Sequence, residues 1–261
     1  MIAQTGLVQS APPGQAWLEK FKTAVLDLLF PPYCVACRRL GAWLCPSCLA
    51  EVETIHPPVC RRCGLPLTSD ELGHGGTWVC DHCRRAPLQL DGLLAYAYHG
   101  GPLREAIHQF KYEDLRSLAG PLGKLMGDGW AMLAPLDLEI DTIVPVPLHP
   151  ARQRQRGYNQ SALLARELGA VLARPVVEDV LIRTKATAPQ VDLNARERRA
   201  NVQDAFQCTS SALQGKRVLL VDDVCTTGCT LESACSALRA AGVSSVWAYT
   251  LARARPGPHE T

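Results

Sequence analysis

The sequence predicts an α/β protein in which a parallel sheet flanked by helices follows a small, cysteine-rich module. Eight of the 12 cysteines form four CxxC pairs before residue 84. From residue 91 onward, strand-like and helix-like segments alternate, which is typical of parallel strands joined by crossover helices. A chain of 261 residues is long enough to hold both units.

The composition divides the chain into four stretches. Residues 16–30 place apolar side chains on one helical face, and Pro31 and Pro32 end that helix. We expect the helix to pack on its own protein, and a membrane surface or a partner is the alternative. The expected stretches are a tail with this amphipathic helix (1–30), a double zinc-binding module (31–88), an α/β domain (89–254) and a C-terminal tail (255–261).

Charge and hydropathy exclude several classes of protein. The formal net charge is +2, from 27 basic and 25 acidic residues, so the overall charge identifies no partner. No run of about 18 uncharged apolar residues predicts a transmembrane helix. The N-terminal stretch has no basic region followed by an apolar region, so it does not resemble a secretory signal. We therefore expect a cytoplasmic protein, with peripheral membrane association left open.

The CxxC pairs predict two structural zinc ions. Two thiolates from each tight turn reach one ion, and two turns complete a tetrahedral shell without an open position. In a reducing compartment, metal binding is favoured over disulfides. His74 and His82 lie near the last pair, and we expect neither to be a ligand. Sequential pairing, favoured over a crossed arrangement, gives the ligand sets Cys34, Cys37, Cys45 and Cys48, and Cys60, Cys63, Cys80 and Cys83.

The alternating region is expected to contain four strands and four helices. Residues 218–221 are apolar on both faces, which suits the buried centre of a parallel sheet. The expected strands are 91–98, 141–147, 217–223 and 244–253, and the expected helices are 103–112, 115–133, 159–173 and 231–242.

Two acids and a turn of small residues follow the central apolar run. In open α/β sheets, ligands bind at the carboxyl ends of the strands, where these acids lie. Asp222 and Asp223 are able to accept hydrogen bonds from the hydroxyls of a ribose, while threonine hydroxyls and backbone N–H groups of the turn donate to a phosphate. Neither GxxxxGK[ST] nor GxGxxG occurs in the chain. We expect Cys225 and Cys229 to be packing residues rather than nucleophiles.

The stretch VLLVDDVCTTGCT, residues 218–230, resembles the signature of type I phosphoribosyltransferases for phosphoribosyl pyrophosphate (PRPP). The resemblance implies a parallel sheet like that of type I phosphoribosyltransferases. It also implies that Asp222 and Asp223 hold the ribose hydroxyls. The residues that would surround the 5-phosphate are Thr226, Thr227, Gly228 and Thr230.

Two basic segments support this interpretation. Arg152, Arg154 and Arg156 follow a predicted strand, where they could neutralise a departing pyrophosphate together with Mg²⁺. Residues 183–206 resemble the loop that closes over PRPP in these folds. The residues of that loop that match amidophosphoribosyltransferases are Arg183, Thr184, Gln190, Arg196 and Arg199.

The double CxxC module, VPVPLHPxRxRxRGYNQ, RTKxTxxQ and VDDVxTTGxT together resemble the ComF family, over about residues 30–252. The FKY at 110–112 belongs to the same pattern and adds Lys111 to the PRPP-binding set. The resemblance implies zinc, PRPP with Mg²⁺, and a role in the uptake or use of external DNA through competence-machinery partners. An enzyme of this kind would transfer the phosphoribosyl group to an acceptor that the sequence does not identify, with Asp222, Asp223 and Arg183 as the catalytic residues. A non-catalytic PRPP sensor and a module that handles single-stranded DNA remain alternatives.

Overall fold

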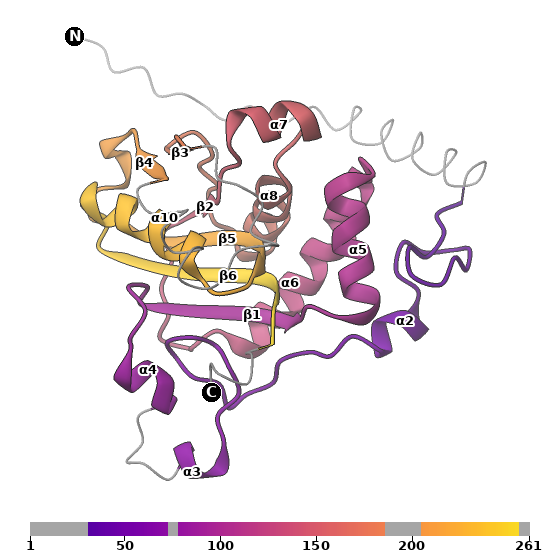
Figure 1. Ribbon diagram of the computed structural model, residues 1–261, viewed down its shortest axis with the longest axis horizontal. Coiled ribbons are helices and arrows are strands. Elements are labelled where there is room, and N and C mark those ends of the chain that lie inside the picture. The colour runs from indigo at the N-terminus through magenta and orange to yellow at the C-terminus, as the bar shows by residue number, and fades with distance from the viewer. Residues whose placement is uncertain (1–30, 73–77, 186–204, 256–261) are drawn as a thin grey trace.

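The computed structural model describes residues 31–72, 78–185 and 205–255 (Figure 1). The predicted amphipathic helix over 16–30, His74, most of the predicted closing loop and nearly all of the C-terminal tail lie outside these residues. Three of the five loop residues matched to amidophosphoribosyltransferases lie outside the described ranges: Gln190, Arg196 and Arg199.

A four-stranded parallel sheet forms the centre of the molecule, as the sequence predicted. Its strand order is β1-β6-β5-β2, and all three pairings are parallel. Side chains of a strand point alternately to its two faces, and in β5 both sets are buried. The strands are β1 (Gly92–Tyr98), β2 (Thr142–Pro145), β5 (Arg217–Cys225) and β6 (Ser245–Arg253).

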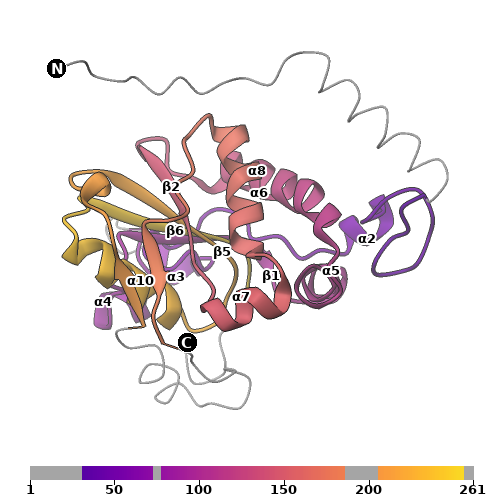
Figure 2. The same cartoon turned by 90° about the horizontal axis from the view of Figure 1, so that it is seen from above.

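Helices cover both faces of the sheet (Figure 2). One apolar cluster joins Leu219 and Val221 of β5 to α5, α6 and α8, and another joins Val218 and Leu220 to α10 and a two-stranded ribbon. Among the described helices, none is long and apolar enough to cross a membrane. These elements are α5 (Gly101–Tyr112), α6 (Ala119–Leu133), α8 (Gln160–Leu172), α10 (Cys229–Ala240), β3 (Leu181–Arg183) and β4 (Phe206–Cys208), with the 3₁₀ turns η1 (Arg116–Leu118) and η3 (Ser211–Leu213).

The structure differs from the expected elements near the carboxyl ends of two strands. Strand β5 continues through both acids to Cys225, because Asp222 and Val224 pair with residues of β6. A short helix that the sequence analysis did not predict, α7 (Pro150–Arg156), follows β2. His149 caps it by accepting a hydrogen bond from the Ala151 N–H through Nδ1, at 3.3 Å.

The cysteine-rich module extends the sheet at its β1 edge. The Ile55 N–H donates to the Tyr96 carbonyl, and the Tyr98 N–H donates to the Glu53 carbonyl, both at 2.9 Å. This antiparallel pairing covers backbone groups that an edge strand would otherwise expose. The predicted boundary near residue 88 stays a prediction. The helices of the module are α2 (Pro46–Ala50), α3 (Ser69–Leu72) and α4 (Asp81–Arg85).

Candidate functional site

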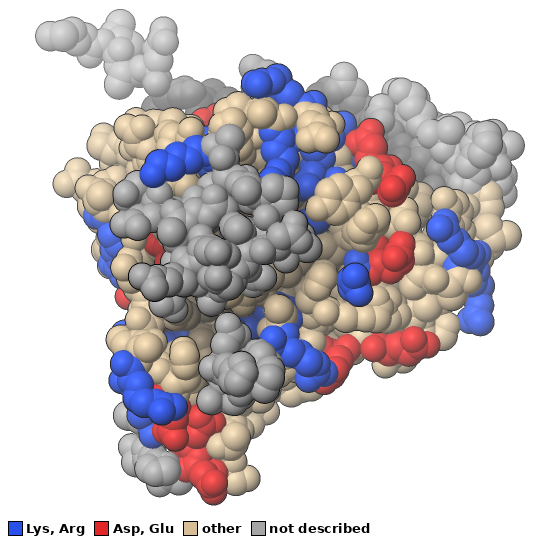
Figure 3. Space-filling model, viewed as in Figure 1, with Lys and Arg blue, Asp and Glu red and all other residues tan. Residues whose placement is uncertain are grey.

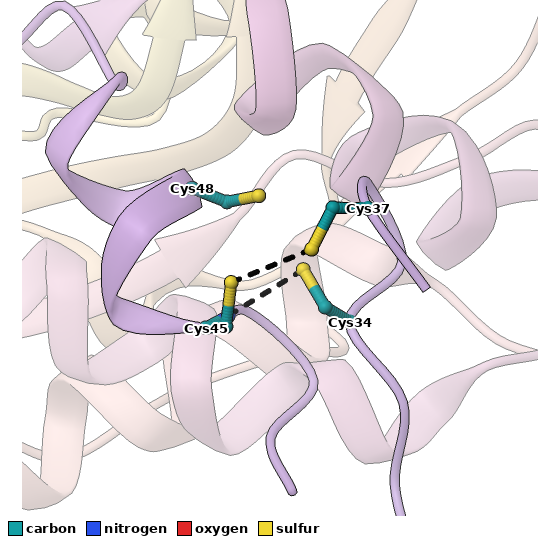
Figure 4. A group of neighbouring side chains, drawn as sticks. All are labelled: Cys34, Cys37, Cys45 and Cys48. Atoms are coloured by element: carbon teal, nitrogen blue, oxygen red, sulfur yellow. Dashed lines mark hydrogen bonds between the residues drawn. The ribbon is translucent and has the colours of Figure 1, made fainter. Parts of the chain in front are cut away.

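The eight paired cysteines form two clusters. Within each, the four sulfur atoms lie within 4.8 Å of one another, and Figure 4 shows the first cluster, of Cys34, Cys37, Cys45 and Cys48. The Sγ atoms of Cys37 and Cys45 are 3.5 Å apart, and those of Cys63 and Cys80 are 3.7 Å apart. A tetrahedron with Zn–S bonds of about 2.3 Å has S···S edges of about 3.8 Å, so both clusters fit zinc. The sequential pairing is confirmed, and His82 belongs to neither cluster.

Both clusters are built for a structural rather than a catalytic metal. The Cys45 N–H lies 3.5 Å from the Cys34 sulfur, and the Cys80 N–H lies 3.3 Å from the Cys60 sulfur, so the same backbone contact supports a thiolate in each. Of the eight cysteines, only Cys37 is exposed. Four thiolates fill a tetrahedral shell and leave no position for a substrate.

A cavity of about 860 Å³ opens at the carboxyl edge of the sheet. It lies among the ends of β1, β2 and β5, helix α7, the last turn of α5 and the first turn of α10. Thr227 is not among its lining residues, and its hydroxyl donates to the Cys229 sulfur at 3.1 Å instead. The predicted site residues that line the cavity are Lys111, Arg152, Arg154, Arg156, Arg183, Asp222, Asp223, Thr226, Gly228 and Thr230.

The two adjacent acids have different surroundings. Asp223 is 3% exposed, and its Oδ1 lies 2.7 Å from the Lys111 ammonium. Within the described residues its Oδ2 has no hydrogen-bond partner, although it is buried. Asp222 accepts hydrogen bonds from the Ser161 hydroxyl at 2.7 Å and from the Asp223 N–H at 2.9 Å. Burial and the charge of Asp223 raise the pKa of Asp222 to about 6.

The turn after β5 places small residues and a helix terminus at the cavity. Gly228 has φ +82°, a left-handed conformation that favours glycine, and it caps α10. Thr226 and Thr230 line the cavity beside it, where the N-terminus of a helix favours an anion. Burial raises the pKa of the Cys225 thiol to about 11, so this thiol stays protonated at neutral pH, as expected of a packing residue.

Arginines form the opposite side of the cavity. Arg152, Arg154 and Arg156 come from α7, and Figure 3 shows basic side chains gathered at the top of the molecule, where α7 lies in Figure 1. Arg183, at the end of β3, is 9% exposed and its guanidinium carbon lies 5.4 Å from the centre of the Phe206 ring. Burial and the nearby Arg152 lower the pKa of Arg183. Neighbouring cations in a partly buried site suit a ligand with several negative charges.

Sequence reasoning missed several residues of the cavity. His99 follows β1 directly, so the rule that selected Asp222 at the end of β5 also applies to it. Burial and the charges of Lys111 and Arg104 lower the pKa of His99, which favours the neutral imidazole. Ser161, which does not line the cavity but holds Asp222, had no local signal because it is 61 residues from Asp222 in the chain.

Comparisons with known proteins agree with this architecture. Residues 25–84 match the family model of the double zinc ribbon domain, and residues 155–260 match that of the phosphoribosyl transferase domain. DNA utilization protein YhgH of Escherichia coli (strain K12) is 33% identical, covering 87% of this chain and 99% of the relative. Competence protein F of Haemophilus influenzae is 32% identical, covering 81% and 90%. Competence protein ComFC of Bacillus subtilis is 25% identical, covering 80% and 84%.

Proposed function

Because this chain belongs to the ComF family, with a double zinc ribbon and a phosphoribosyltransferase domain, we propose that its cavity binds PRPP together with Mg²⁺. The observation that carries the proposal is the meeting of three features in one cavity: a buried pair of acids, a glycine-containing turn at a helix N-terminus, and a group of arginines. Each feature suits a different part of PRPP.

The acids suit the ribose. The free Oδ2 of Asp223 is a buried acceptor within the described residues, and burial without a partner is costly for a carboxylate. A ribose hydroxyl that donates to it removes that cost. Lys111 holds the other oxygen of Asp223, and Ser161 holds Asp222, so both acids are oriented before the sugar arrives. Preorganisation of this kind strengthens binding.

The turn and the arginines suit the two phosphate groups. Thr226, Thr230 and the first N–H groups of α10 would hold the 5-phosphate. Arg152 and Arg183 would face the pyrophosphate, and bound Mg²⁺ would supply further positive charge to neutralise it. Magnesium ligands on the sugar side would come from the ribose hydroxyls and the acids.

We further propose that the chain is a phosphoribosyltransferase. The bond between C1 and the pyrophosphate oxygen breaks, the electron pair leaves with pyrophosphate, and the lone pair of an acceptor forms the new bond to C1. Positive charge develops on the ribose, close to Asp222 and Asp223, while Arg152 and Arg183 stabilise the leaving group. His99, held neutral beside the cavity, would accept the proton that the acceptor loses.

The names of the relatives suggest the biological setting. This chain matches DNA utilization protein YhgH over 99% of that protein's length and competence protein F over 90%. We propose that this protein also acts in the use of external DNA, in the cytoplasm, where thiols remain available to zinc.

Calorimetric titration of the full chain with PRPP and Mg²⁺ tests the proposal. We expect heat of binding to one site, and loss of at least about a hundredfold in affinity for Asp223→Asn, since a charge-assisted acceptor is removed. Asp128→Asn is the matched control, because Asp128 is exposed on α6 and pairs with Lys124 at 2.8 Å. Absence of binding by the wild-type chain, or equal binding by Asp223→Asn, would refute the assignment.

A screen for pyrophosphate release separates the enzyme from a sensor. An enzyme releases pyrophosphate with one acceptor among bases and nucleotides, and loses that activity on Asp223→Asn. A sensor binds PRPP and releases none. A single-stranded DNA module is a second candidate because Arg154 is exposed on α7. In that case affinity for an oligonucleotide would fall steeply with salt and with Arg154→Gln.

A further inference from the structure

One wall of the cavity is not explained by the sugar or its phosphates. Tyr112, the last residue of α5, is 64% exposed and lines the cavity next to Lys111. The Arg156 guanidinium carbon lies 5.3 Å from the centre of its ring. The Arg116 guanidinium carbon lies 4.8 Å from the ring of Tyr158, which is buried. We call Tyr112, Arg116 and Arg156 the outer wall.

The outer wall is held in place from behind. The Tyr158 hydroxyl donates to the Phe110 carbonyl, which ties the start of α8 to the end of α5. Gly157 has φ +80°, and a side chain there would begin 3.0 Å from the Arg116 guanidinium, so glycine allows the close approach. Arg116 therefore stacks on the buried Tyr158 ring and Arg156 on the exposed Tyr112 ring, so that each guanidinium group is held against an aromatic surface.

Arg156 differs from Lys111 and Arg116 in the group that its positive charge contacts. Among the described residues, six Lys and Arg side chains and three Asp side chains line the cavity. Lys111 is paired with Asp223, and Arg116 is paired with Asp114 at 2.8 Å. Arg156 donates instead to the neutral amide of Gln160, at 2.5 Å. Its positive charge therefore has only a neutral hydrogen-bond acceptor in this contact, which leaves it suited to an anion.

We propose that the outer wall is the acceptor subsite, and that it takes a flat heterocycle bearing its own carboxylate or phosphate. This inference rests on the proposed PRPP site. The ring of the acceptor stacks on Tyr112, and its anionic group pairs with Arg156 and is attracted by Arg116. Arg156 thereby acts on the acceptor, while Arg152 and Arg183 remain with the pyrophosphate.

The same features disfavour the simplest alternative acceptor. Ammonia or an aliphatic amine has no flat surface to stack, and its protonated form is repelled by Arg116 and Arg156. The cavity, at about 860 Å³, lies near the upper end of the range of roughly 300–1,000 Å³ for small-molecule sites, which leaves room for a ring beside a sugar phosphate.

Two pairs of probes test the charge requirement. Orotate and uracil share a ring but differ in a carboxylate, whereas AMP and adenosine share a base and ribose but differ in a phosphate. Binding of each to the full chain is measured by calorimetry without PRPP. We expect one anionic member to bind about tenfold more tightly than its neutral partner, because it gains a charge-assisted hydrogen bond. The pair that shows the preference identifies a carboxylate or a phosphate as the anionic group.

Variants separate the contribution of the anionic group from the contribution of ring stacking. Arg156→Gln should make the anionic and neutral members of that pair bind equally, while Tyr112→Ala should weaken both by about tenfold through lost stacking. Arg174→Gln, which removes an exposed arginine outside the cavity, should change neither. Circular dichroism checks that each variant is folded, and Arg156→Lys, which keeps the positive charge, should retain the preference for the anionic member.

The outcomes also separate this inference from the proposed function. Equal binding of anionic and neutral members by the wild-type chain, no measurable binding of any probe at millimolar concentration, or an unchanged preference in Arg156→Gln would each overturn it. PRPP is titrated separately against the wild-type chain. Failure of that titration alone refutes the PRPP site, whereas PRPP binding with no probe preference refutes only the acceptor subsite.

Discussion

The two zinc ribbons share one local construction but are attached to the molecule in different ways. In the first, the Arg38 N–H donates to the Cys34 carbonyl at 2.7 Å, and in the second the Gly64 N–H donates to the Cys60 carbonyl at the same distance. Both of these residues have positive φ, 64° for Arg38 and 70° for Gly64. The same turn thus carries an arginine in one ribbon and a glycine in the other.

The surroundings of the two turns explain that difference. A side chain at position 64 would begin 2.3 Å from the Leu93 carbonyl oxygen, because this turn lies directly against β1. Arg38 is exposed, and its guanidinium carbon lies 5.2 Å from the centre of the Tyr33 ring. Packing against β1 therefore excludes a side chain at position 64 of the second ribbon. The corresponding Arg38 of the first ribbon is exposed, so its side chain is accommodated.

The ribbons also connect to the rest of the molecule through different contacts. Cys34, Cys45 and Cys48 belong to the same apolar cluster as α5, α6 and α8, and α2 lies beside α5 in Figure 1. The second cluster of cysteines forms a small apolar cluster of its own. It is joined to the sheet by hydrogen bonds, one of them from Arg253 to the Cys63 carbonyl. The comparison indicates that the first ribbon is part of the main core, whereas the second has a small core of its own and meets β1 through its Gly64 turn.

Removing a single ligand from each ribbon should produce the largest effect. Cys34→Ser and Cys60→Ser should each lower the zinc content from two ions to one. Structural zinc contributes about 10–16 kcal/mol of apparent folding free energy in small zinc domains, so each ribbon should lose its structure. We expect Cys34→Ser to lower the main melting temperature by roughly 10 °C, because its ribbon shares the main core. Cys60→Ser should add an earlier transition and leave the main one within a few degrees.

Metal analysis and differential scanning calorimetry measure these outcomes. Cys208→Ser is the control, since Cys208 lies in neither cluster and should leave both zinc content and melting unchanged. Equal melting behaviour of the two ligand variants would contradict the proposed difference in attachment.

Substitutions at the corresponding positions of the two turns test the packing argument directly. Gly64→Ala should lower the free energy of unfolding by about 3 kcal/mol or more, because alanine is strained at φ +70° and its Cβ meets a backbone oxygen. Arg38→Gly should stay within about 1 kcal/mol of the wild type, because glycine relieves the positive φ but loses the contact with Tyr33. Urea unfolding and the rate of zinc release to a chelator report both. A tolerated Gly64→Ala would show that the second turn is not held against β1.

The contrast between the ribbons also shows which features could be predicted from the sequence. Ligand pairing followed from CxxC spacing, because each pair lies within one turn and the two pairs of a cluster are neighbours in the chain. The parallel sheet followed from the alternation of strands and helices, and the acids at the cavity followed from their place at the end of an apolar run. These signals are all local.

Contacts between distant segments gave no such signal. Arg253 and Cys63 are 190 residues apart, and nothing in either segment indicates that they meet. The outer wall likewise depends on how α5 and α7 meet, and α7 is a helix of only 7 residues that shows no long periodic pattern. Attachment of the module to β1 through Ile55 was missed for the same reason.

Arg253 offers a smaller perturbation that is confined to the second ribbon. It is 8% exposed, and besides its contact with Cys63 its carbonyl accepts from the His99 N–H at 2.8 Å. Arg253→Met keeps most of the side-chain volume but leaves the Cys63 carbonyl without this donor. The loss should destabilise the second ribbon by about 1–3 kcal/mol. In a Cys34→Ser background, where only the second zinc remains, zinc release should become faster. Arg255→Met is the control, because Arg255 pairs with exposed Glu53 and stacks on the Tyr98 ring, and neither partner is a zinc ligand. Equal release rates for the two variants would refute the role of Arg253.

The mildest perturbation is a change of pH, and it should separate the sugar site from both ribbons. Asp222 has a raised pKa of about 6, and the Ser161 hydroxyl donates a hydrogen bond to it. None of the hydrogen bonds described above joins either ribbon to these two residues. The ionised carboxylate is the better acceptor for ribose hydroxyls, so PRPP affinity should fall as the pH drops through 6, by about tenfold at pH 5. Phosphate groups of PRPP also titrate near pH 6, and Asp222→Asn measures their share because it lacks the carboxyl group. The pH dependence due to Asp222 should persist in Cys60→Ser; its loss there would show that the second ribbon controls the acids as well as its own zinc.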